Sequence, residues 1–165
     1  MMKALVLQKE SPDIHIESLP IPALGDNDVL VGMKSAALNR RDVWICRGKY
    51  AKIEYPAVLG SDGAGIVAEV GKNVSKEWLG KEVVIHPSLH WGDNPAAQSK
   101  QYSILGMPTS GTLAEYCAVP AENIFIKPPH LSFDEAGAFP LAYLTAYRAV
   151  VRQANVHYVG AVMQF

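Results

Sequence analysis

Short apolar runs rich in β-branched residues recur along the first three quarters of the chain, and turn residues separate them. These runs cover residues 3–7, 15–19, 29–35, 65–70, 82–85, 112–119 and 124–127. Runs of this length between proline, glycine and aspartate clusters are typical of antiparallel strands. Several short strands in succession predict a barrel or a sandwich.

Two segments carry helical signals instead. Residues 39–48 combine Asn39, which can cap a helix, with a short helical stretch and a stop at Gly48. Near the other end, SFDE at 132–135 is a capping box, and Pro140 can open a helix that runs to about residue 154. We therefore expect a mainly β domain of the α+β class over residues 1–130, followed by a helical segment over 131–165.

A glycine cluster at 60–65 contains the string GAGIVA at 63–68, which matches a dinucleotide-binding fingerprint. Such a phosphate-binding turn must open a helix, whereas the residues that follow are β-branched and stop at Gly71. We expect a tight, glycine-lined turn that leads into a strand. Ser61 and Asp62 can simply be residues of that turn.

Composition narrows the functional classes. The 165 residues are 49% hydrophobic and 19% charged, with a net charge of -1. This balance offers no basic footprint for nucleic acid, and no apolar run has the length of a membrane helix or a secretory signal. We expect a cytoplasmic protein without a membrane or nucleic-acid partner, in which Cys46 and Cys117 are unpaired thiols.

Several motifs in register carry a resemblance to a known family. They are Asn39-x-x-Asp42, Arg47-Gly48-x-Tyr50, the glycine cluster from Pro56 to Gly71, GTLAEY at 111–116, Pro120-x-x-Asn123 with Lys127-Pro128, and LAYLTAY at 141–147. Together they span nearly the whole chain and resemble the medium-chain dehydrogenase/reductase superfamily. The resemblance implies a GroES-like domain, which is a partly open β-barrel with short helices and a C-terminal helical segment.

The family's catalytic zinc site is where this sequence departs from the pattern. The aligned positions carry Asn39, Ser61 and Leu141, and an amide, a hydroxyl and an aliphatic side chain cannot supply the donors that zinc needs. The four structural-zinc cysteines are also missing from the long polar loop at 86–111. A set of His86, His90 and Asp93 would need a helix that Pro87 and Gly92 disfavour, so we expect no metal site.

The resemblance to the zinc-free quinone reductases implies the substrate-side domain of an NAD(P)H-dependent oxidoreductase that reduces quinones, enones or related carbonyl compounds. Conjugate reduction suits a site without metal, because neutral hydrogen-bond donors can stabilise the conjugated oxygen. Asn39 and Tyr50 would face the nicotinamide and the substrate, Asp42 would orient the short helix, and Thr145 would contact the cofactor.

Each of these residues also has a structural interpretation. Asn39 can be a helix cap, Tyr50 an exposed aromatic residue and Thr145 a packing residue. Trp91 and Tyr102 in the long loop can wall a flat ligand or only anchor the loop.

Two other functions stay open. The domain can be a non-enzymatic binding or scaffold module, or a zinc-type alcohol dehydrogenase domain with unusual ligands such as His86, His90 and Cys46. The glycine-rich phosphate turn of the family does not follow Asn155 in the sequence, so we expect this chain alone to bind no NAD or NADP and to be inactive. The apolar residues around 141–151 and 159–165 predict a homo-oligomer.

Overall fold

The computed structural model describes residues 1–9 and 13–156. Its strands are β1 (Met2–Leu7), β2 (Ile14–Leu19), β3 (Asp28–Ala37), β4 (Ala57–Val58), β5 (Asp62–Val70), β6 (Glu82–Ile85), β7 (Ser88–Leu89), β8 (Ser103–Ile104), β9 (Tyr116–Pro120) and β10 (Ile124–Ile126). The helices are α1 (Arg40–Cys46), α2 (Phe133–Ala138) and α3 (Pro140–Tyr147), with short turns η1 (Lys76–Trp78), η2 (Ala121–Asn123) and η3 (Arg148–Gln153). The predicted mainly β fold with short helices is confirmed.

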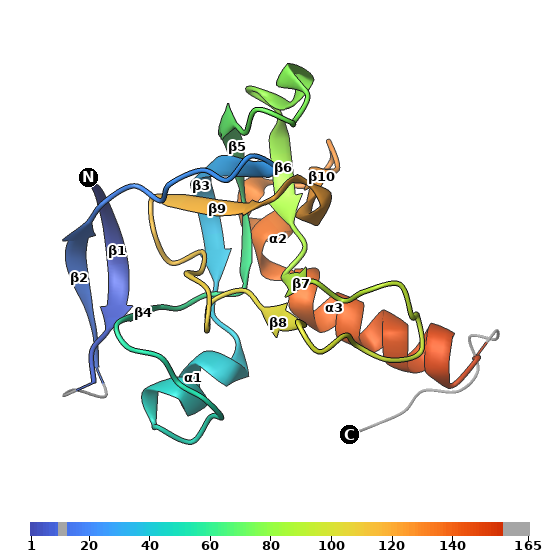
Figure 1. The fold of residues 1–165 in the computed structure, drawn as a ribbon. Helices are drawn as coiled ribbons and strands as arrows, with labels where there is room; N and C mark the ends of the chain where they lie inside the picture. Colours follow the sequence, from blue (N-terminus) through green and yellow to red (C-terminus); the bar gives the residue numbers. More distant parts are fainter. Residues whose placement is uncertain (10–12, 157–165) are drawn as a thin grey trace.

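The described strands form three open sheets, so the β-structure does not close into a barrel (Figure 1). The largest sheet has the order β10-β6-β5-β3-β9, and a second has the order β2-β1-β4. Both sheets are antiparallel throughout. The pair β7 and β8 was not predicted as strands, because two residues are too short to show an alternating pattern.

Alternation in β3 and β5 builds the main core. Val29, Val31 and Val67 are buried between the elements of the five-stranded sheet, together with Val83 and Val119 from neighbouring strands. A second cluster of Leu7, Ile45, Ala57, Leu59 and Met107 fixes α1 against β1 and β4. The helix α1 is therefore held by packing at one end of β3.

The glycine cluster differs in one respect from the prediction. Only Gly60 needs a left-handed backbone, with φ of +95°, and a Cβ there would meet Thr112 Oγ1 at 2.6 Å. The strand β5 already begins at Asp62, so the predicted glycine-lined turn is shorter than expected. GAGIVA lies inside this strand and opens no helix, which excludes the phosphate-binding interpretation.

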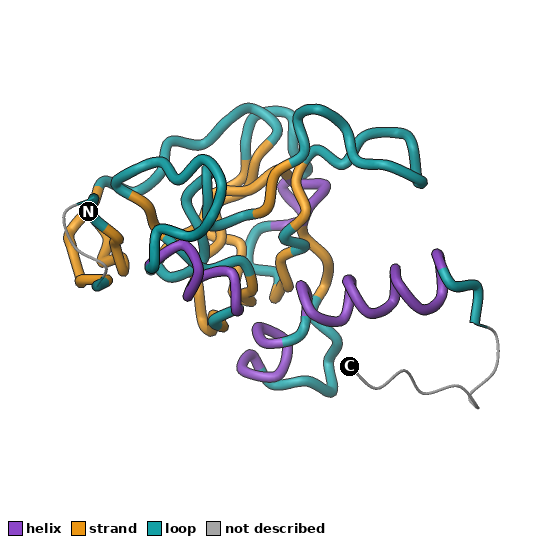
Figure 2. The backbone as a smooth tube through the Cα atoms, turned by 90° about the horizontal axis from the view of Figure 1, so that it is seen from below, coloured by secondary structure: helices purple, strands orange, loops and turns teal. Residues whose placement is uncertain are grey.

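The helical segment is confirmed at both of its signals. Ser132 Oγ accepts a hydrogen bond from the Glu135 backbone N–H, and Glu135 Oε2 accepts one from the Ser132 N–H. Helix α3 starts at Pro140 and continues as the π-helical turn η3 to Gln153. Figure 2 shows α3 and η3 projecting away from the sheets. A domain boundary at residue 130 stays a prediction.

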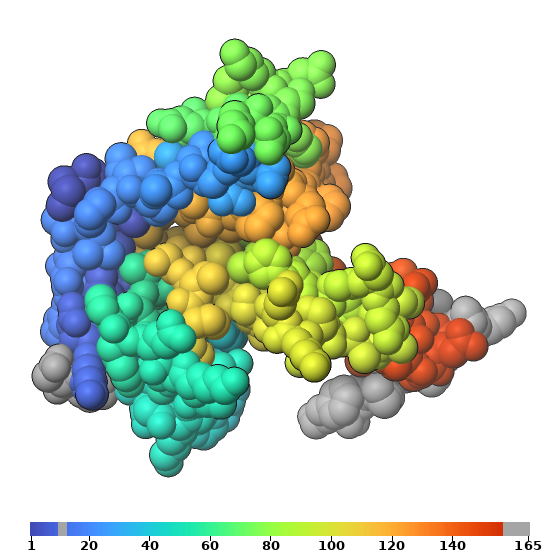
Figure 3. All heavy atoms as spheres, viewed as in Figure 1, coloured from blue at the N-terminus to red at the C-terminus, as the bar shows by residue number. Residues whose placement is uncertain are grey.

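The predicted long loop folds back on this projecting helix. We call residues 90–102, between β7 and β8, the lobe. In Figure 3 its atoms lie against those of α3 and η3 on one side of the molecule. Within the described residues, no helix is long and apolar enough to cross a membrane.

Candidate functional site

The Asp62 carboxylate joins three elements at the start of β5. Oδ1 accepts the backbone N–H of Leu141 at 2.8 Å, and Oδ2 accepts the Asn39 side-chain N–H at 3.0 Å. Leu141 is the second residue of α3, whose first residue is a proline without an N–H. A carboxylate from a distant strand therefore caps this helix, which satisfies one of the backbone donors that every helix leaves free at its N-terminus.

Asp62 is almost completely buried, with 1% of its surface exposed. Burial raises the pKa of its carboxyl group, and the hydrogen bonds from Asn39 and Leu141 lower the pKa by less. The nearby Asp42 carboxylate adds a further upward shift of this pKa. From the sequence, Asp62 is interpreted as a turn residue. No local pattern in the sequence indicates that its partners lie at the starts of two helices.

Asn39 and Asp42 are brought together at the start of α1. Asp42 Oδ2 accepts the Asn39 backbone N–H at 2.7 Å, and Asp42 Oδ1 lies 3.4 Å from the Gly60 nitrogen. The Asn39 side-chain amide donates to Asp62, so Asn39 is more than a helix cap. Asp42 is 3% exposed and contacts backbone donors. Its role in orienting the short helix stays a prediction.

Arg41 is a buried residue of this region that the sequence did not single out. Its Nη1 donates to Ser61 Oγ and to the Leu105 carbonyl, both at 2.8 Å, and its Nη2 donates to the Met107 carbonyl at 3.2 Å. Its Nε finds no hydrogen-bond partner among the residues that the structure describes. One guanidinium thus links α1 to Ser61, directly before β5, and to the segment that follows β8. The available sequence signal was the spacing of Arg41 and Ile45, which lie four residues apart and therefore on one face of a helix. The structure shows that both are buried.

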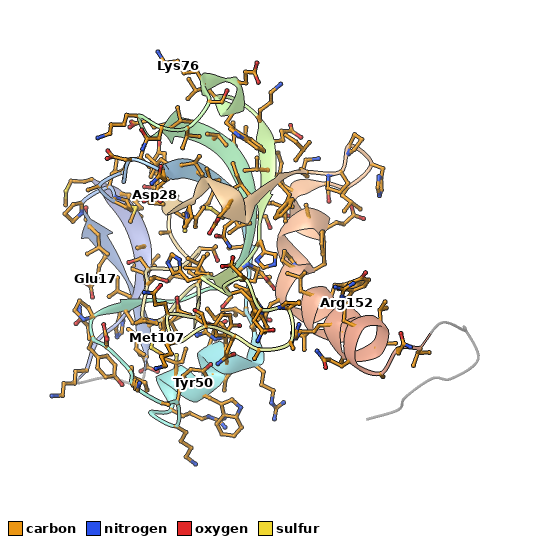
Figure 4. All side chains as sticks on the ribbon, turned by 45° about the vertical axis from the view of Figure 1, so that its right-hand side comes forward. Glu17, Asp28, Tyr50, Lys76, Met107 and Arg152 are labelled. Atoms are coloured by element: carbon orange, nitrogen blue, oxygen red, sulfur yellow. The ribbon has the colours of Figure 1, made fainter. Side chains whose placement is uncertain are left out.

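Tyr50 packs beside α1, and its described contacts do not include Asp62. The Arg41 guanidinium is 5.2 Å from the centre of its ring, and the ring packs against the cluster that contains Met107. Figure 4 shows Tyr50 and Met107 beside α1, and Arg152 on the projecting helical segment. The described structure thus does not bring Tyr50 together with Thr145.

A cavity of about 670 Å³ lies between the lobe and the projecting helix. We call it the cleft. Residues of α3 and η3 form one wall, and residues of β7, β8 and the lobe form the other. The cleft is lined, among others, by His86, Ser88, Trp91, Tyr102, Ile104, Leu141, Leu144, Thr145, Arg148 and Arg152. Thr145, the predicted cofactor contact, is therefore in the cleft, whereas Asn39 reaches it only through Asp62 and Leu141.

Arg148, the first residue of η3, contacts the lobe at three residues. Arg148 donates to the backbone carbonyls of Pro95 at 2.9 Å and Ala96 at 3.2 Å. Its guanidinium also lies 4.4 Å from the centre of a Trp91 ring, and Trp91 meets Tyr102 edge to face at 5.1 Å. Trp91 and Tyr102 therefore contact each other within the lobe and also line the cleft. Their predicted role as the wall for a flat ligand stays a prediction.

The possible metal donors are dispersed or engaged. Ser61 Oγ is bonded to Arg41 and to the Leu105 carbonyl, and both oxygens of Asp62 accept N–H groups. In the part of the chain that the structure describes, no three His, Cys, Asp or Glu residues are grouped so that they could hold a metal ion. The residues present do not fit the family's catalytic zinc.

Both cysteines are free thiols. Burial raises the pKa of Cys117 to about 12. Burial, with a smaller effect of Asp42, also raises the pKa of Cys46. Neither thiol is therefore activated for nucleophilic chemistry.

Comparisons with known proteins agree with this fold. The family model of the alcohol dehydrogenase GroES-like domain matches residues 25–129. A zinc-type alcohol dehydrogenase-like protein of Schizosaccharomyces pombe is 35% identical over 128 residues, which are 77% of this chain and 37% of that protein. A trans-enoyl reductase of Aspergillus flavipes is 34% identical over 148 residues, which are 89% of this chain and 40% of that protein.

Solved structures give the same result. The crystal structure of an NAD-dependent alcohol dehydrogenase has a TM-score of 0.87 and 40% identity, over 94% of this chain and 48% of that one. The chain belongs to the medium-chain alcohol dehydrogenase/reductase family and carries its GroES-like domain. It spans less than half the length of the curated relatives described above.

Proposed function

We propose that the chain is the substrate-side part of a zinc-independent, NAD(P)H-dependent oxidoreductase that reduces enones, quinones or related carbonyl compounds. The observation that carries this proposal is the network around Asp62. It occupies the place where the motif alignment puts the family's metal ligands, and its amide, hydroxyl and carboxylate groups are bonded to protein groups. Without a metal, the chemistry must rely on neutral hydrogen-bond donors.

The cleft offers such donors. Ser88 and Tyr102 line it, and within the described residues neither hydroxyl makes a hydrogen bond. An O–H group aimed at a developing enolate oxygen stabilises charge that appears only in the transition state. In this proposal, Tyr102 or a water molecule then gives the α-carbon or the oxygen its proton.

When bound, a nicotinamide cofactor would supply the hydride. The Thr145 hydroxyl donates to the Leu141 carbonyl at 2.7 Å, so its remaining lone pairs can accept an N–H from the nicotinamide carboxamide. Asp62 fixes the first turn of α3 and thereby the position of Thr145, one turn further along. The trans-enoyl reductase named above supports conjugate reduction as the reaction class. The roles of Asn39 and Tyr50 beside the nicotinamide stay predictions.

The test is turnover by a protein in which this chain is joined to the family's dinucleotide-binding domain. Cofactor absorbance is followed with NADH and NADPH and a panel of benzoquinone, menadione and benzalacetone. We expect oxidation of the cofactor with at least one of them. A folded protein that turns over none of the panel would remove the proposal.

Metal content tests the zinc-free part separately. After dialysis against buffer without chelator, elemental analysis of the same protein is expected to find zinc well below one equivalent. Retention of a full equivalent would contradict zinc independence. It would favour an unusual ligand set such as His86, His90 and Cys46.

A further inference from the structure

The charges around the cleft are of one sign. Arg148 and Arg152 line its far end, and none of its lining residues within the described chain is Asp or Glu. Asp93 belongs to the lobe, but its side chain is exposed and is not part of the lining. A ligand in this cleft therefore meets an excess of positive charge.

The two arginines differ in how their guanidinium groups are used. Arg148 is bonded to the carbonyls of Pro95 and Ala96 and stacked on Trp91. These partners are neutral, so they orient its charge without cancelling it. Arg152 makes no hydrogen bond or ion pair within the described residues. Its planar group with five N–H donors is free to hold a carboxylate or a phosphate.

The opposite end and the walls of the cleft are uncharged. Thr145 and Leu141 lie at the end near Asp62, while Trp91, Ile104 and Leu144 supply aromatic and aliphatic surface. Seven residues separate Thr145 from Arg152, which corresponds to roughly 10 Å along a helix. The cleft therefore combines a reaction end, an apolar middle and a cationic end.

We propose that the substrate is an anionic conjugated carbonyl compound, whose carboxylate or phosphate binds Arg152 while its reducible end lies toward Thr145. This inference rests on the proposed function, since it names the substrate class of the same site. Arg148 contributes charge but keeps the lobe in place. Arg152 is then a residue that determines specificity.

Binding to the chain of 165 residues tests the proposal directly. Benzalacetone is compared with its para-carboxylate and with its para-phosphate ester by titration calorimetry. We expect the anionic probes to bind about tenfold more tightly than the neutral one, as a charge-assisted hydrogen bond at a partly exposed site allows. Arg152→Gln should remove this preference and leave benzalacetone binding unchanged.

Lys100→Gln is the matched control, because Lys100 is an exposed base of the lobe that does not line the cleft. It should keep the preference. A stronger response to the carboxylate or to the phosphate identifies which anion the site takes. Equal binding of neutral and anionic probes, or a preference that survives Arg152→Gln, would overturn the proposal.

Nicotinamide mononucleotide separates substrate from cofactor. If its affinity falls about tenfold in Arg152→Gln while the enone probes are unaffected, the arginine serves the cofactor phosphate and the proposal is wrong. Turnover of neutral benzalacetone without any preference for its carboxylate would refute the anionic substrate and leave the proposed function standing. If the carboxylate binds in an Arg152-dependent way but no substrate is turned over, the anion site is supported and the proposed function is refuted.

Discussion

At the scale of single residues, burial and hydrogen bonding have opposite effects on the pKa of Asp62. Its carboxylate is buried, yet both oxygens accept hydrogen bonds that favour the charged form. Desolvation is the larger effect, so the folded state holds the proton more tightly than the unfolded chain does. Stability is therefore linked to pH through this one group.

The sign of the linkage is fixed by the raised pKa. Between the ordinary aspartate pKa and the raised value, the folded state binds more protons than the unfolded state, so the free energy of unfolding falls as pH rises. Asp62→Asn cannot titrate, and it also places an N–H against one of two N–H donors, which costs about 1–3 kcal/mol. We expect the wild type to be more stable than this variant, by a margin that shrinks as pH rises through the window.

Urea unfolding of both proteins across acid and neutral pH measures this margin. Asp134→Asn, an exposed aspartate in the first turn of α2, is the control. A margin for Asp62 that grows with pH would show that the hydrogen bonds outweigh desolvation.

Tyr102 is the residue whose hydroxyl the reaction should need. In the joined protein, Tyr102→Phe should lower kcat about a hundredfold with enones, because it removes a donor to the developing enolate. The change keeps the ring that contacts Trp91, so KM should move little. Tyr143→Phe, on an exposed tyrosine outside the cleft, should leave kcat unchanged. Equal rates for wild type and Tyr102→Phe would remove this residue from the mechanism.

At the scale of elements, the lobe is a loop that depends on a helix. Its contacts with η3 pass through Arg148, which offers two hydrogen bonds and one stacked ring. Loops with few buried contacts open locally more easily than the sheets they leave. We therefore expect η3 and the lobe to fold and to open locally as one unit.

Arg148→Met should loosen the lobe without unfolding the sheets. We expect limited proteolysis at the Lys100 bond to become about fivefold faster, which corresponds to about 1 kcal/mol of lost protection. Arg152→Met, one turn further on the same helix and without these contacts, should leave the cleavage rate as in the wild type. Unchanged cleavage in Arg148→Met would mean that other contacts hold the lobe.

At the scale of the whole molecule, α3 exposes large apolar side chains, two of which, Leu144 and Tyr147, also line the cleft. Tyr143 is 71% exposed, Tyr147 is 56% exposed and Leu144 is 36% exposed. Exposed apolar surface of this kind favours association. The predicted contribution of residues 159–165 lies outside the described residues.

We expect this chain to form a dimer or a larger oligomer through that surface. Sedimentation velocity over a range of concentrations should show association, and the double substitution Tyr143→Lys with Tyr147→Lys should shift the chain toward monomer. Ile16→Lys, at an exposed position of β2, is the control and should not change the distribution. A monomer at all concentrations would contradict the prediction.

The sequence by itself determined the features that depend on neighbouring residues. Short apolar runs between turn residues placed β1, β3 and β6, and the capping box at Ser132 and the proline at 140 placed α2 and α3, because backbone preferences and caps act over a few positions. Ordered motifs also identified the family, and the residue types at Asn39, Ser61 and Leu141 led us to predict that its catalytic zinc site is missing.

Only the tertiary structure decided which of these groups meet. Asp62 lies 23 residues from Asn39 and 79 from Leu141 along the chain, and no local pattern links such positions. The same holds for Arg41, whose partners come from the residue before β5 and from the segment after β8, and for Arg148, which binds the lobe. Long-range hydrogen bonds depend on how sheets and helices pack, so the site and its cleft became visible only in the folded chain.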